Sequence, residues 1–264
     1  MREAKAEAEP LLSIVVPAYN EAQNVRNGVL ARLADYLAGR PYSYEVLVAD
    51  DGSVDETASL VEAFCREHPA FRLMRNEHSG KAQSVIAGLM AARGRHVMFM
   101  DMDLATSLEH IDQLLEALQN RADVVIASRE AKGAVRLGAA WRRRFLGKAF
   151  NLVIQALLLP GYWDTQCGFK GFRREVARDL VNSLVVFRDG PPPSGPRVTA
   201  FDVELLVAAR ERGYRIYQLP VTWRHVKTPR VNLLRESVLM LREVLAVWRA
   251  RREGRYRPSP DREG

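Results

Sequence analysis

Strand-like and helix-like hydrophobic patterns alternate along the first half of this 264-residue chain. Short apolar runs are typical of buried strands, and the segments between them repeat their apolar residues with helical spacing. The predicted strands cover residues 11–18, 44–49, 71–75, 96–100 and 124–127, and the predicted helices cover residues 21–37, 55–67, 81–92 and 108–118. This alternation favours an α/β fold in which helices flank a mostly parallel sheet. Ligands of such sheets bind beyond the carboxyl ends of the strands.

The second half of the chain is less regular. It predicts basic or amphipathic helices at 141–159 and 231–252, a further helix at 201–212, a strand at 214–223 and a proline-rich loop at 188–197. The expected organisation is a disordered N-terminus (1–10), one domain (11–228) made of two halves (11–128 and 129–228), and a C-terminal amphipathic helix with a tail (229–264).

Composition is that of an ordinary globular chain, with 47% hydrophobic and 27% charged residues. Two cysteines in unrelated contexts favour a reducing compartment. We expect no signal peptide or membrane anchor, because no stretch reaches the ~18–20 apolar residues that span a bilayer. Residues 129–148 hold seven basic residues and one acid, which favours an anionic partner such as a phosphate or a membrane surface. Nucleic acid is not expected, since no aromatic-basic interleaving accompanies this charge.

Polar side chains gather after all five predicted strands of the first half. Helix caps explain one or two such positions, but five in succession predict a functional site. The clusters are Pro17, Tyr19, Asn20 and Glu21; Asp50, Asp51, Gly52, Ser53 and Asp55; Asn76, Gly80 and Lys81; Asp101 and Asp103; and Ser128 and Arg129. The two aspartates of the fourth cluster can grip one cation, because Mg²⁺ is typically bound by one or two carboxylates together with phosphate oxygens.

These clusters, in this order, resemble the inverting GT-A glycosyltransferases of family 2. The motifs that carry the resemblance are VPAYNE (16–21), DDGSxDxT (50–57), Gly80-Lys81 and Asp101-Met102-Asp103. The segments DTQCGFK (164–170), FDVELL (201–206) and PVxW (220–223) are similar to the dolichyl-phosphate β-glucosyltransferase branch and, more loosely, to dolichyl-phosphate mannose synthases. The resemblance covers about residues 11–250 and implies a GT-A, Rossmann-like fold.

The resemblance also implies how the first half would hold a donor. Tyr19 would stack on the nucleobase, and Asp50 or Asp51, the latter being favoured, would accept the imide N–H of uracil. Lys81 would neutralise the diphosphate at a helix N-terminus, where anions bind favourably. The expected donor-binding residues are Pro17, Tyr19, Glu21, Asp50, Asp51, Lys81, Asp101 and Met102.

Mg²⁺ or Mn²⁺ is the implied cofactor, with Asp101 and Asp103 as its ligands. It would act as a Lewis acid on the departing UDP, and Asp103 is expected to be the direct ligand. The chain departs from the family at Ala82, often glycine, at Met102, often alanine, and at Ala105, where mannose-branch members offer a glutamine ligand. We therefore expect the two aspartates to share the metal with the diphosphate and water.

The acceptor would be held by residues of the second half. Arg129 and Arg143 are expected to receive its phosphate, because the planar guanidinium pairs bidentately with phosphate. Gln166 and Lys170 would shape the acceptor pocket, and Gly168 would allow close approach. The expected catalytic residues are Asp103, Asp202 and Arg129.

Asp202 and Glu204 are the candidates for a general base. Asp202 could equally orient Arg129 or the sugar. A phosphate acceptor is already ionised at neutral pH, so positioning and charge stabilisation can carry the reaction without a strong base.

Together these features predict a metal-dependent enzyme that moves a hexose, glucose being favoured, from UDP-glucose to a polyprenyl or dolichyl phosphate. Residues 141–159 and 231–252 combine aromatic, basic and apolar side chains, so peripheral contact with the cytoplasmic face of an anionic membrane is expected. Two alternatives stay open: the same fold acting on a soluble phosphorylated acceptor, and a non-catalytic module that binds a nucleotide sugar.

Overall fold

A computed structural model describes residues 9–138, 141–188, 199–226 and 233–258, without the side chains of 141–146, 149 and 233–237. Among these residues, seven strands form one sheet in the order β3-β2-β1-β4-β7-β5-β8. Neighbouring strands are parallel except at β7, which runs antiparallel to both β4 and β5. The strands are β1 (Leu12–Ala18), β2 (Tyr44–Asp50), β3 (Phe71–Arg75), β4 (His96–Met100), β5 (Val124–Ser128), β7 (Phe169–Arg173) and β8 (Ile216–Pro220). The predicted α/β fold with a mostly parallel sheet is confirmed.

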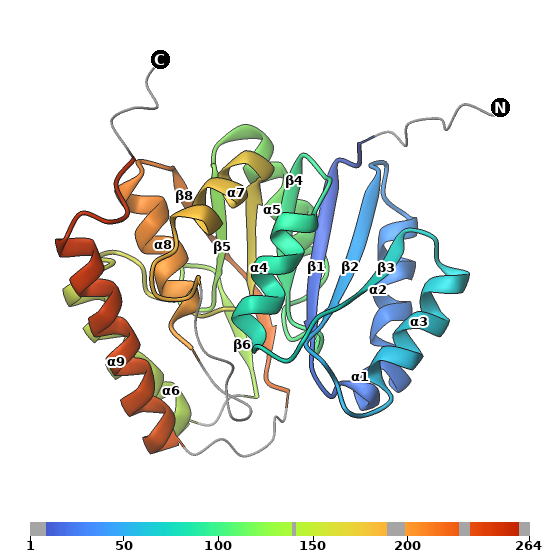
Figure 1. Ribbon diagram of the computed structural model, residues 1–264, viewed down its shortest axis with the longest axis horizontal. Coiled ribbons are helices and arrows are strands. Elements are labelled where there is room, and N and C mark those ends of the chain that lie inside the picture. The colour runs from blue at the N-terminus through green and yellow to red at the C-terminus, as the bar shows by residue number, and fades with distance from the viewer. Residues whose placement is uncertain (1–8, 139–140, 189–198, 227–232, 259–264) are drawn as a thin grey trace.

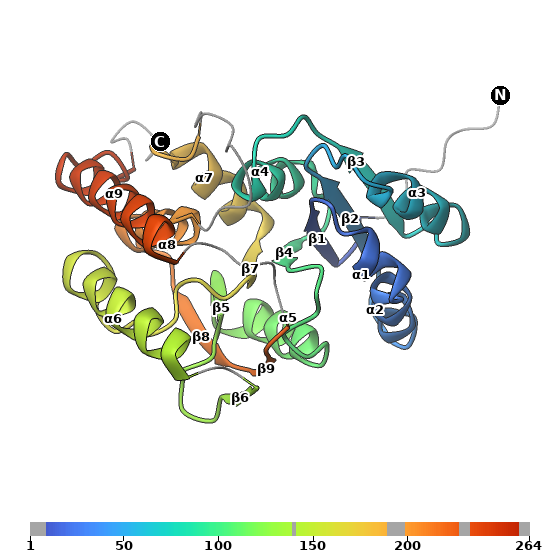
Figure 2. The ribbon, with the colours of Figure 1, turned by 90° about the horizontal axis from the view of Figure 1, so that it is seen from below.

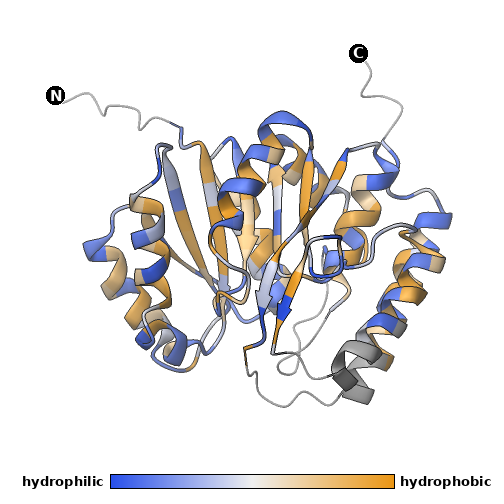
Figure 3. Cartoon of the chain, turned by 180° about the vertical axis from the view of Figure 1, so that it is seen from behind, coloured by the Kyte–Doolittle hydropathy of each residue, from blue (hydrophilic) through white to orange (hydrophobic). Residues whose placement is uncertain are grey.

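Helices flank the sheet on both faces (Figures 1 and 2). They are α1 (Ala22–Arg26), α2 (Val29–Ala38), α3 (Thr57–Glu67), α4 (Lys81–Ala91), α5 (His110–Asn120), α6 (Trp141–Leu157), α7 (Arg174–Ser183), α8 (Phe201–Glu211) and α9 (Leu233–Arg252). Successive residues of a strand point to opposite faces, so Ile14 and Val15 of β1 enter different cores. In Figure 3 the central strands are mainly hydrophobic, whereas the helices around them carry both kinds of residue.

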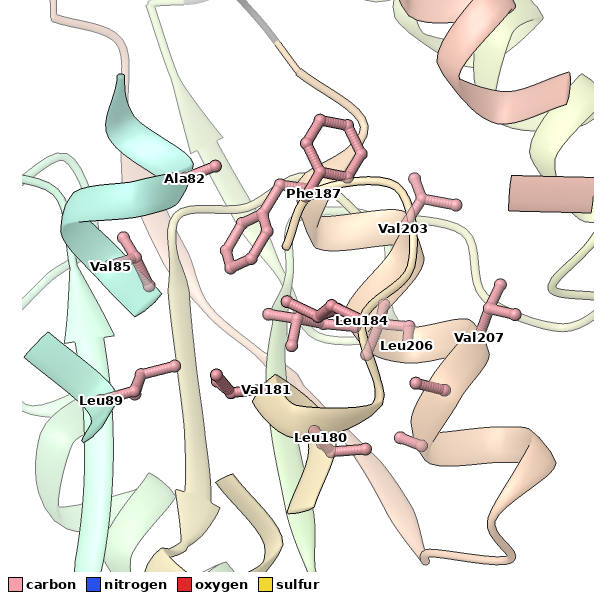
Figure 4. Packing of buried hydrophobic residues seen from close by; sticks show 14 of the residues in the cluster. Ala82, Val85, Leu89, Leu180, Val181, Leu184, Phe187, Val203, Leu206 and Val207 are labelled. Atoms are coloured by element: carbon pink, nitrogen blue, oxygen red, sulfur yellow. The ribbon is translucent and has the colours of Figure 1, made fainter. Parts of the chain in front are cut away.

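The two cores divide the helices between the faces. One core receives apolar side chains from α2, α3 and α5. The other receives them from α4, α7 and α8, and Figure 4 shows Val85 and Leu89 of α4 facing Leu180, Val181 and Leu206. Each Å² of apolar surface that this packing removes from water stabilises the fold by about 25 cal/mol. Burial of apolar surface is therefore the main favourable contribution to folding.

Two predicted elements differ from the structure, and other elements were not predicted. The expected helix 21–37 is interrupted between α1 and α2, where Gly28 adopts a left-handed φ of 75°. The expected strand 214–223 consists of two strands, β8 and β9 (Thr222–Arg224), and β9 pairs with β6 (Val135–Leu137) in a separate two-stranded sheet. Strand β7 and helix α7 were not predicted at all.

Helices α6 and α9 lie side by side at one edge of the molecule, as both ribbon views show (Figures 1 and 2). On the described part of α9, Met240, Val244 and Val247 face the core, while Leu241 and Leu245 are exposed. No helix within the described ranges is long and apolar enough to cross a bilayer. Residues 1–8 of the predicted disordered N-terminus (1–10), and most of the predicted loop at 188–197, lie outside the described residues, whereas Pro10 is buried and its carbonyl oxygen accepts a hydrogen bond from the backbone N–H of Arg95 (3.0 Å). The division into a donor half and an acceptor half stays a prediction.

Candidate active site

The carboxyl end of β2 is fixed to the turn that precedes α4. Asp51 is buried, and its Oδ1 accepts hydrogen bonds from the backbone N–H groups of Ser79 (2.9 Å) and Gly80 (3.0 Å). Its Oδ2 lies 2.9 Å from Nδ1 of His78. Gly52, with φ of 69°, is required here, since a Cβ would lie 2.9 Å from the backbone nitrogen of His78. The contacts of Asp51 therefore hold the start of α4 beside the end of β2.

An aromatic surface and a buried acceptor lie at the same place. The ring of Tyr19 stacks on that of His78, with 4.3 Å between the ring centroids. Asp50 is buried; its Oδ2 accepts a hydrogen bond from the backbone N–H of Ser53 (3.2 Å), while its Oδ1 has no partner among the described residues. A buried carboxylate oxygen without a donor is costly, so Asp50 is a natural acceptor for a ligand N–H. The sequence favoured Asp51 for this contact, and that preference stays a prediction.

The acidic pair follows β4 directly. Asp101 pairs with Lys81, whose Nζ donates to its Oδ1, and the Asp101 side chain remains 39% exposed. Asp103 Oδ1 accepts a hydrogen bond from the backbone N–H of Ala105 (3.0 Å). Directly after Asp103 the chain turns at Leu104, whose φ of 50° lies in the sparsely populated left-handed region. The result is a tight turn that presents two carboxylates to the same space.

Negative charge accumulates in this turn. Burial, together with the negative charge of Asp101, raises the pKa of Asp103. Burial also raises the pKa of Glu21, and the carboxylates of Asp103 and Asp101 raise it further. Glu21 hydrogen-bonds Asn24, which opposes this shift. The three carboxylates therefore repel one another, and a cation placed among them would relieve that repulsion.

This chemistry fits a hard divalent cation. The donors are carboxylate oxygens, which Mg²⁺ prefers, and they come from residues predicted as metal ligands. In the described ranges, however, no three His, Cys, Asp or Glu side chains are arranged to hold an ion by themselves. Asp101 and Asp103 would supply two ligands, and the remaining positions would go to phosphate oxygens and water.

Lys81 supplies the positive charge of the site. Partial desolvation of its half-exposed side chain opposes the charged form, but the carboxylates of Asp101 and Asp202 outweigh this effect and hold the pKa of Lys81 above its ordinary value. Asp202 and Lys81 belong to α8 and α4, whose first turns are joined through Phe187: its ring packs edge-on against Phe201, and its carbonyl oxygen accepts a hydrogen bond from Gln83 (2.7 Å). The ammonium is charged at neutral pH and available to an anion.

Arg129, at the end of β5, is bound to a buried carboxylate. Its backbone N–H and Nε donate to Oδ2 of Asp164 (2.7 Å each), and its Nη2 donates to Oδ1 (2.8 Å). Burial alone would raise the pKa of Asp164, but Arg129 outweighs burial and lowers it. The guanidinium also lies 5.3 Å from the ring centroid of Trp223. Two donors of its fork are thus committed to Asp164, and its predicted contact with an acceptor phosphate is untested.

The segment that contains Asp164 continues along the floor of the site. The backbone N–H of Asp101 donates to the carbonyl oxygen of Gly168 (3.0 Å), and a Cβ on Gly168 would lie 2.1 Å from Oδ2 of Asp101. Gly168 therefore lies directly against the Asp101 carboxylate, whereas the close approach expected there in an acceptor pocket stays a prediction. Gly168 and Asp101 line a small pocket with Trp223 and Leu104. No functional role was predicted for Trp223 from the sequence. Its place in this pocket depends on the chain leaving the main sheet after β8 and entering the two-stranded sheet at β9.

Other predicted site residues lie deeper or elsewhere. The side chain of Met102 is 2% exposed and packs in the core, and Pro17 is buried within β1. Gln166 donates from Nε2 to Sδ of Met240 (2.9 Å) in α9. The side chain of Arg143 lies outside the described residues.

The structure bears on the roles predicted for Lys170, an acceptor contact, and for Glu204, a general base. Lys170 is fully buried, with its Nζ 2.6 Å from both the Cys167 carbonyl oxygen and Oδ1 of Asp202. Glu204, a candidate base, is also fully buried, so that prediction is wrong. Its carboxylate accepts hydrogen bonds from the backbone N–H groups of residues 185, 186 and 187 and from the hydroxyl of Tyr256. Glu204 is a structural residue that fastens α8 to the turn after α7.

The fold and the acidic site at the sheet edge define a glycosyltransferase. The chain belongs to the family described as Glycosyl transferase family 2, whose model matches residues 13–181. A dolichyl-phosphate beta-glucosyltransferase of Drosophila melanogaster is 33% identical over 90% of this chain and 74% of its own length. One from Trichomonas vaginalis, ALG5C, is 32% identical over 86% of this chain and 67% of its own length. The resemblance found in the motifs is thereby confirmed.

Solved structures show the same fold. The mannosyltransferase PcManGT from Pyrobaculum calidifontis, in complex with GDP-Man and Mn²⁺, is 22% identical with a TM-score of 0.59, over 93% of this chain and 65% of that one. Glucosyl-3-phosphoglycerate synthase from Mycobacterium tuberculosis, in complex with Mn²⁺, UDP and its product, is 22% identical with a TM-score of 0.60, over 96% and 82%. These similarities support the GT-A assignment.

Proposed function

We propose that this protein is an inverting glycosyltransferase that moves glucose from UDP-glucose to a dolichyl or other polyprenyl phosphate with the help of Mg²⁺ or Mn²⁺. The observation that carries the proposal is the convergence of Asp101, Asp103 and Lys81 at one edge of the sheet. Relatives named as dolichyl-phosphate glucosyltransferases support the choice of sugar and acceptor, and a neighbour with UDP and Mn²⁺ supports the nucleotide and the metal.

The chain's residues divide the work as follows. Tyr19 and the buried carboxylates of Asp50 and Asp51 bind the nucleobase. Asp101 and Asp103 would hold the metal ion, which when bound supplies positive charge to the departing UDP. Lys81 adds a second positive charge, because its ammonium can pass from Asp101 to the donor diphosphate.

Transfer is a single displacement at the anomeric carbon. An oxygen of the acceptor phosphate attacks on the face opposite UDP, the new carbon–oxygen bond forms as the bond to UDP breaks, and the configuration inverts. The attacking oxygen is already ionised at neutral pH, so no proton has to be removed. Arg129 and Arg143 receive the acceptor phosphate, and Asp202 orients a reacting group rather than acting as a base.

The lipid acceptor places the enzyme at the cytoplasmic surface of a membrane. Exposed Val238, Leu241 and Leu245 of α9 alternate with exposed Arg242 and Arg249, which supports peripheral contact with anionic lipid. Cosedimentation with anionic liposomes at low salt should carry the protein into the pellet. Its absence from the pellet would favour the alternative of a soluble phosphorylated acceptor.

The test is transfer of radiolabelled glucose from UDP-glucose to a polyprenyl phosphate. We expect activity that requires Mg²⁺ or Mn²⁺ and is abolished by EDTA. Asp103→Ala should reduce it at least about 100-fold, because removing a group that orients a metal already costs 10–100-fold. Asp35→Ala, a change at an exposed aspartate of α2, serves as the matched control and should leave the rate unchanged. Full activity in EDTA would refute the metal role, and UDP binding without any transfer would favour a non-catalytic module.

A further inference from the structure

Lys170 is a charged residue in the centre of the sheet. It lies on β7, opposite Phe99 of β4, and its side chain is fully buried. Its ammonium donates to the carbonyl oxygen of Cys167 and to Oδ1 of Asp202, both at 2.6 Å, and lies 5.5 Å from the ring centroid of Phe99. No solvent reaches this ammonium, so an acceptor phosphate in the pocket could not contact it without a rearrangement of the strand.

A buried ammonium is tolerated only with a compensating charge. Removing one partner of a buried ion pair costs about 3–5 kcal/mol, because the other charge is left uncompensated. The partner here is Asp202, in the first turn of α8, whose side chain is 15% exposed. Lys170 thus offsets and fixes a carboxylate that is partly open to ligands.

Asp202 in turn belongs to the donor-phosphate region. The Lys170 ammonium that binds Asp202 also binds the Cys167 carbonyl oxygen, and the next residue, Gly168, lies against the carboxylate of Asp101, the partner of Lys81. Four charges therefore alternate around one space: Lys170, Asp202, Lys81 and Asp101. The pair formed by Lys170 and Asp202 has no net charge, so it adds little repulsion toward an anionic ligand at Lys81.

The same short segment positions two more site residues. Asp164 accepts three hydrogen bonds from Arg129, and Gly168 contacts the carboxylate of Asp101. Residues 164–170 therefore touch Arg129, Asp101 and Asp202 in turn. This pattern is that of a supporting element rather than of a pocket wall.

We propose that Lys170 is a positioning residue, which holds Asp202 beside Lys81 and cancels its charge so that a nucleoside diphosphate can bind there. This role rests on the proposed function, since it assumes a donor diphosphate at Lys81. It replaces the expected contact between Lys170 and the acceptor.

The test compares UDP affinity, measured by calorimetry with Mn²⁺, in Lys170→Met, Asp202→Asn and the double variant. Lys170→Met leaves Asp202 as an uncompensated negative charge near the diphosphate, so UDP affinity should fall about tenfold or more. Asp202→Asn removes that charge, so the double variant should regain affinity to within about threefold of wild type, a non-additive result. Thermal unfolding of all three variants controls for stability.

Several results would overturn the proposal. Loss of stability in Lys170→Met without loss of UDP affinity would show a merely structural role. A double variant weaker than Lys170→Met, or a raised acceptor KM with unchanged UDP affinity, would show that Lys170 does not act through Asp202. If Lys170→Met yields no folded protein, the comparison of Lys170→Arg with wild type decides, because the retained charge should preserve UDP affinity.

The outcome is separable from that of the proposed function. UDP binding needs neither the acceptor nor the sugar, so the comparison can be made even if wild-type protein transfers no glucose. Absence of transfer in wild type would overturn the proposed activity, whereas the pattern of UDP affinities alone decides the role of Lys170.

Discussion

Replacing Gly168 with alanine should displace a carboxylate while leaving the fold intact. A Cβ at this position would lie 2.1 Å from Oδ2, 2.4 Å from Cγ and 2.5 Å from Oδ1 of Asp101. Contacts this short cannot persist, so one of the two groups has to move by about 1 Å or more. The Asp101 side chain is 39% exposed and rotates about two bonds, whereas Gly168 is held in the backbone beside β7. The carboxylate is therefore the group that moves.

The expected consequence is a large loss of activity with a small loss of stability. A misplacement of about 1 Å at a group that orients the reaction can cost about 100-fold in rate. The free energy of unfolding should fall by only about 1–2 kcal/mol, which corresponds to about 2–8 °C in Tm for a chain of this size. The assay is glucose transfer at saturating donor, combined with thermal unfolding of the same sample.

Gly147→Ala is the matched control. Gly147 lies on α6, and a Cβ there would meet nothing within 4 Å among the described parts of the chain. Alanine is favoured over glycine in helices by about 1 kcal/mol, so this variant should be fully active and slightly more stable. A Gly168→Ala enzyme within threefold of the wild-type rate would refute the reasoning, as would one that fails to fold.

Three further predictions concern charged residues of the site and core. Lys81→Met should tighten the binding of Mn²⁺ in the absence of nucleotide by about two- to fivefold, as measured by calorimetry. The ammonium and the cation compete for Asp101, and an exposed ion pair is worth about 0.2–1 kcal/mol. Weaker Mn²⁺ binding in the variant would contradict this competition. Asp103→Asn should stabilise the metal-free protein at pH 7 by about 0.5–2 kcal/mol. Because the pKa of Asp103 is raised in the folded state, the folded state binds the proton more tightly, and the wild-type protein loses stability as pH rises through that pKa. The stability gained by Asp103→Asn should therefore shrink as pH is lowered toward the ordinary pKa of 3.8. A gain that does not change with pH would exclude this cause. Glu204→Ala should cost at least about 3 kcal/mol in urea unfolding, because several buried donors lose their acceptor, whereas Glu116→Ala, at an exposed glutamate, should change stability by less than about 0.5 kcal/mol.

The parallel part of the sheet could be predicted because most of its strands are short and largely apolar, as in β1, β4 and β5. Strand β7 could not, because Lys170 and Gly171 interrupt its apolar pattern. Both interruptions have structural reasons: the ammonium of Lys170 is paired with Asp202, and a Cβ on Gly171 would lie 2.4 Å from Leu114 of α5. The antiparallel direction of β7 also depends on where the chain returns to the sheet, which hydrophobic periodicity does not record.

The same limit applies to the site. The residues at strand ends were predictable, since parallel strands bring their carboxyl ends to one edge. The contacts that position those residues join distant parts of the chain, as between Gly168 and Asp101 or between Lys170 and Asp202. The family resemblance implied an acceptor contact for Lys170 and made Glu204 a candidate base, because a buried charge with an internal partner looks like an exposed one in sequence.

The place of β5 in the sheet has a consequence for how this protein is made. Strands β1 to β4 can pair with one another as soon as they leave the ribosome, but β5 pairs only with β7 and β8, which are both synthesised later. All five residues of β5 are buried in the finished protein. During synthesis both edges of this apolar strand therefore stay unpaired until residues 169–173, which form β7, emerge from the ribosome. Nascent chains arrested between these points should be the ones that chaperones bind and that aggregate most readily.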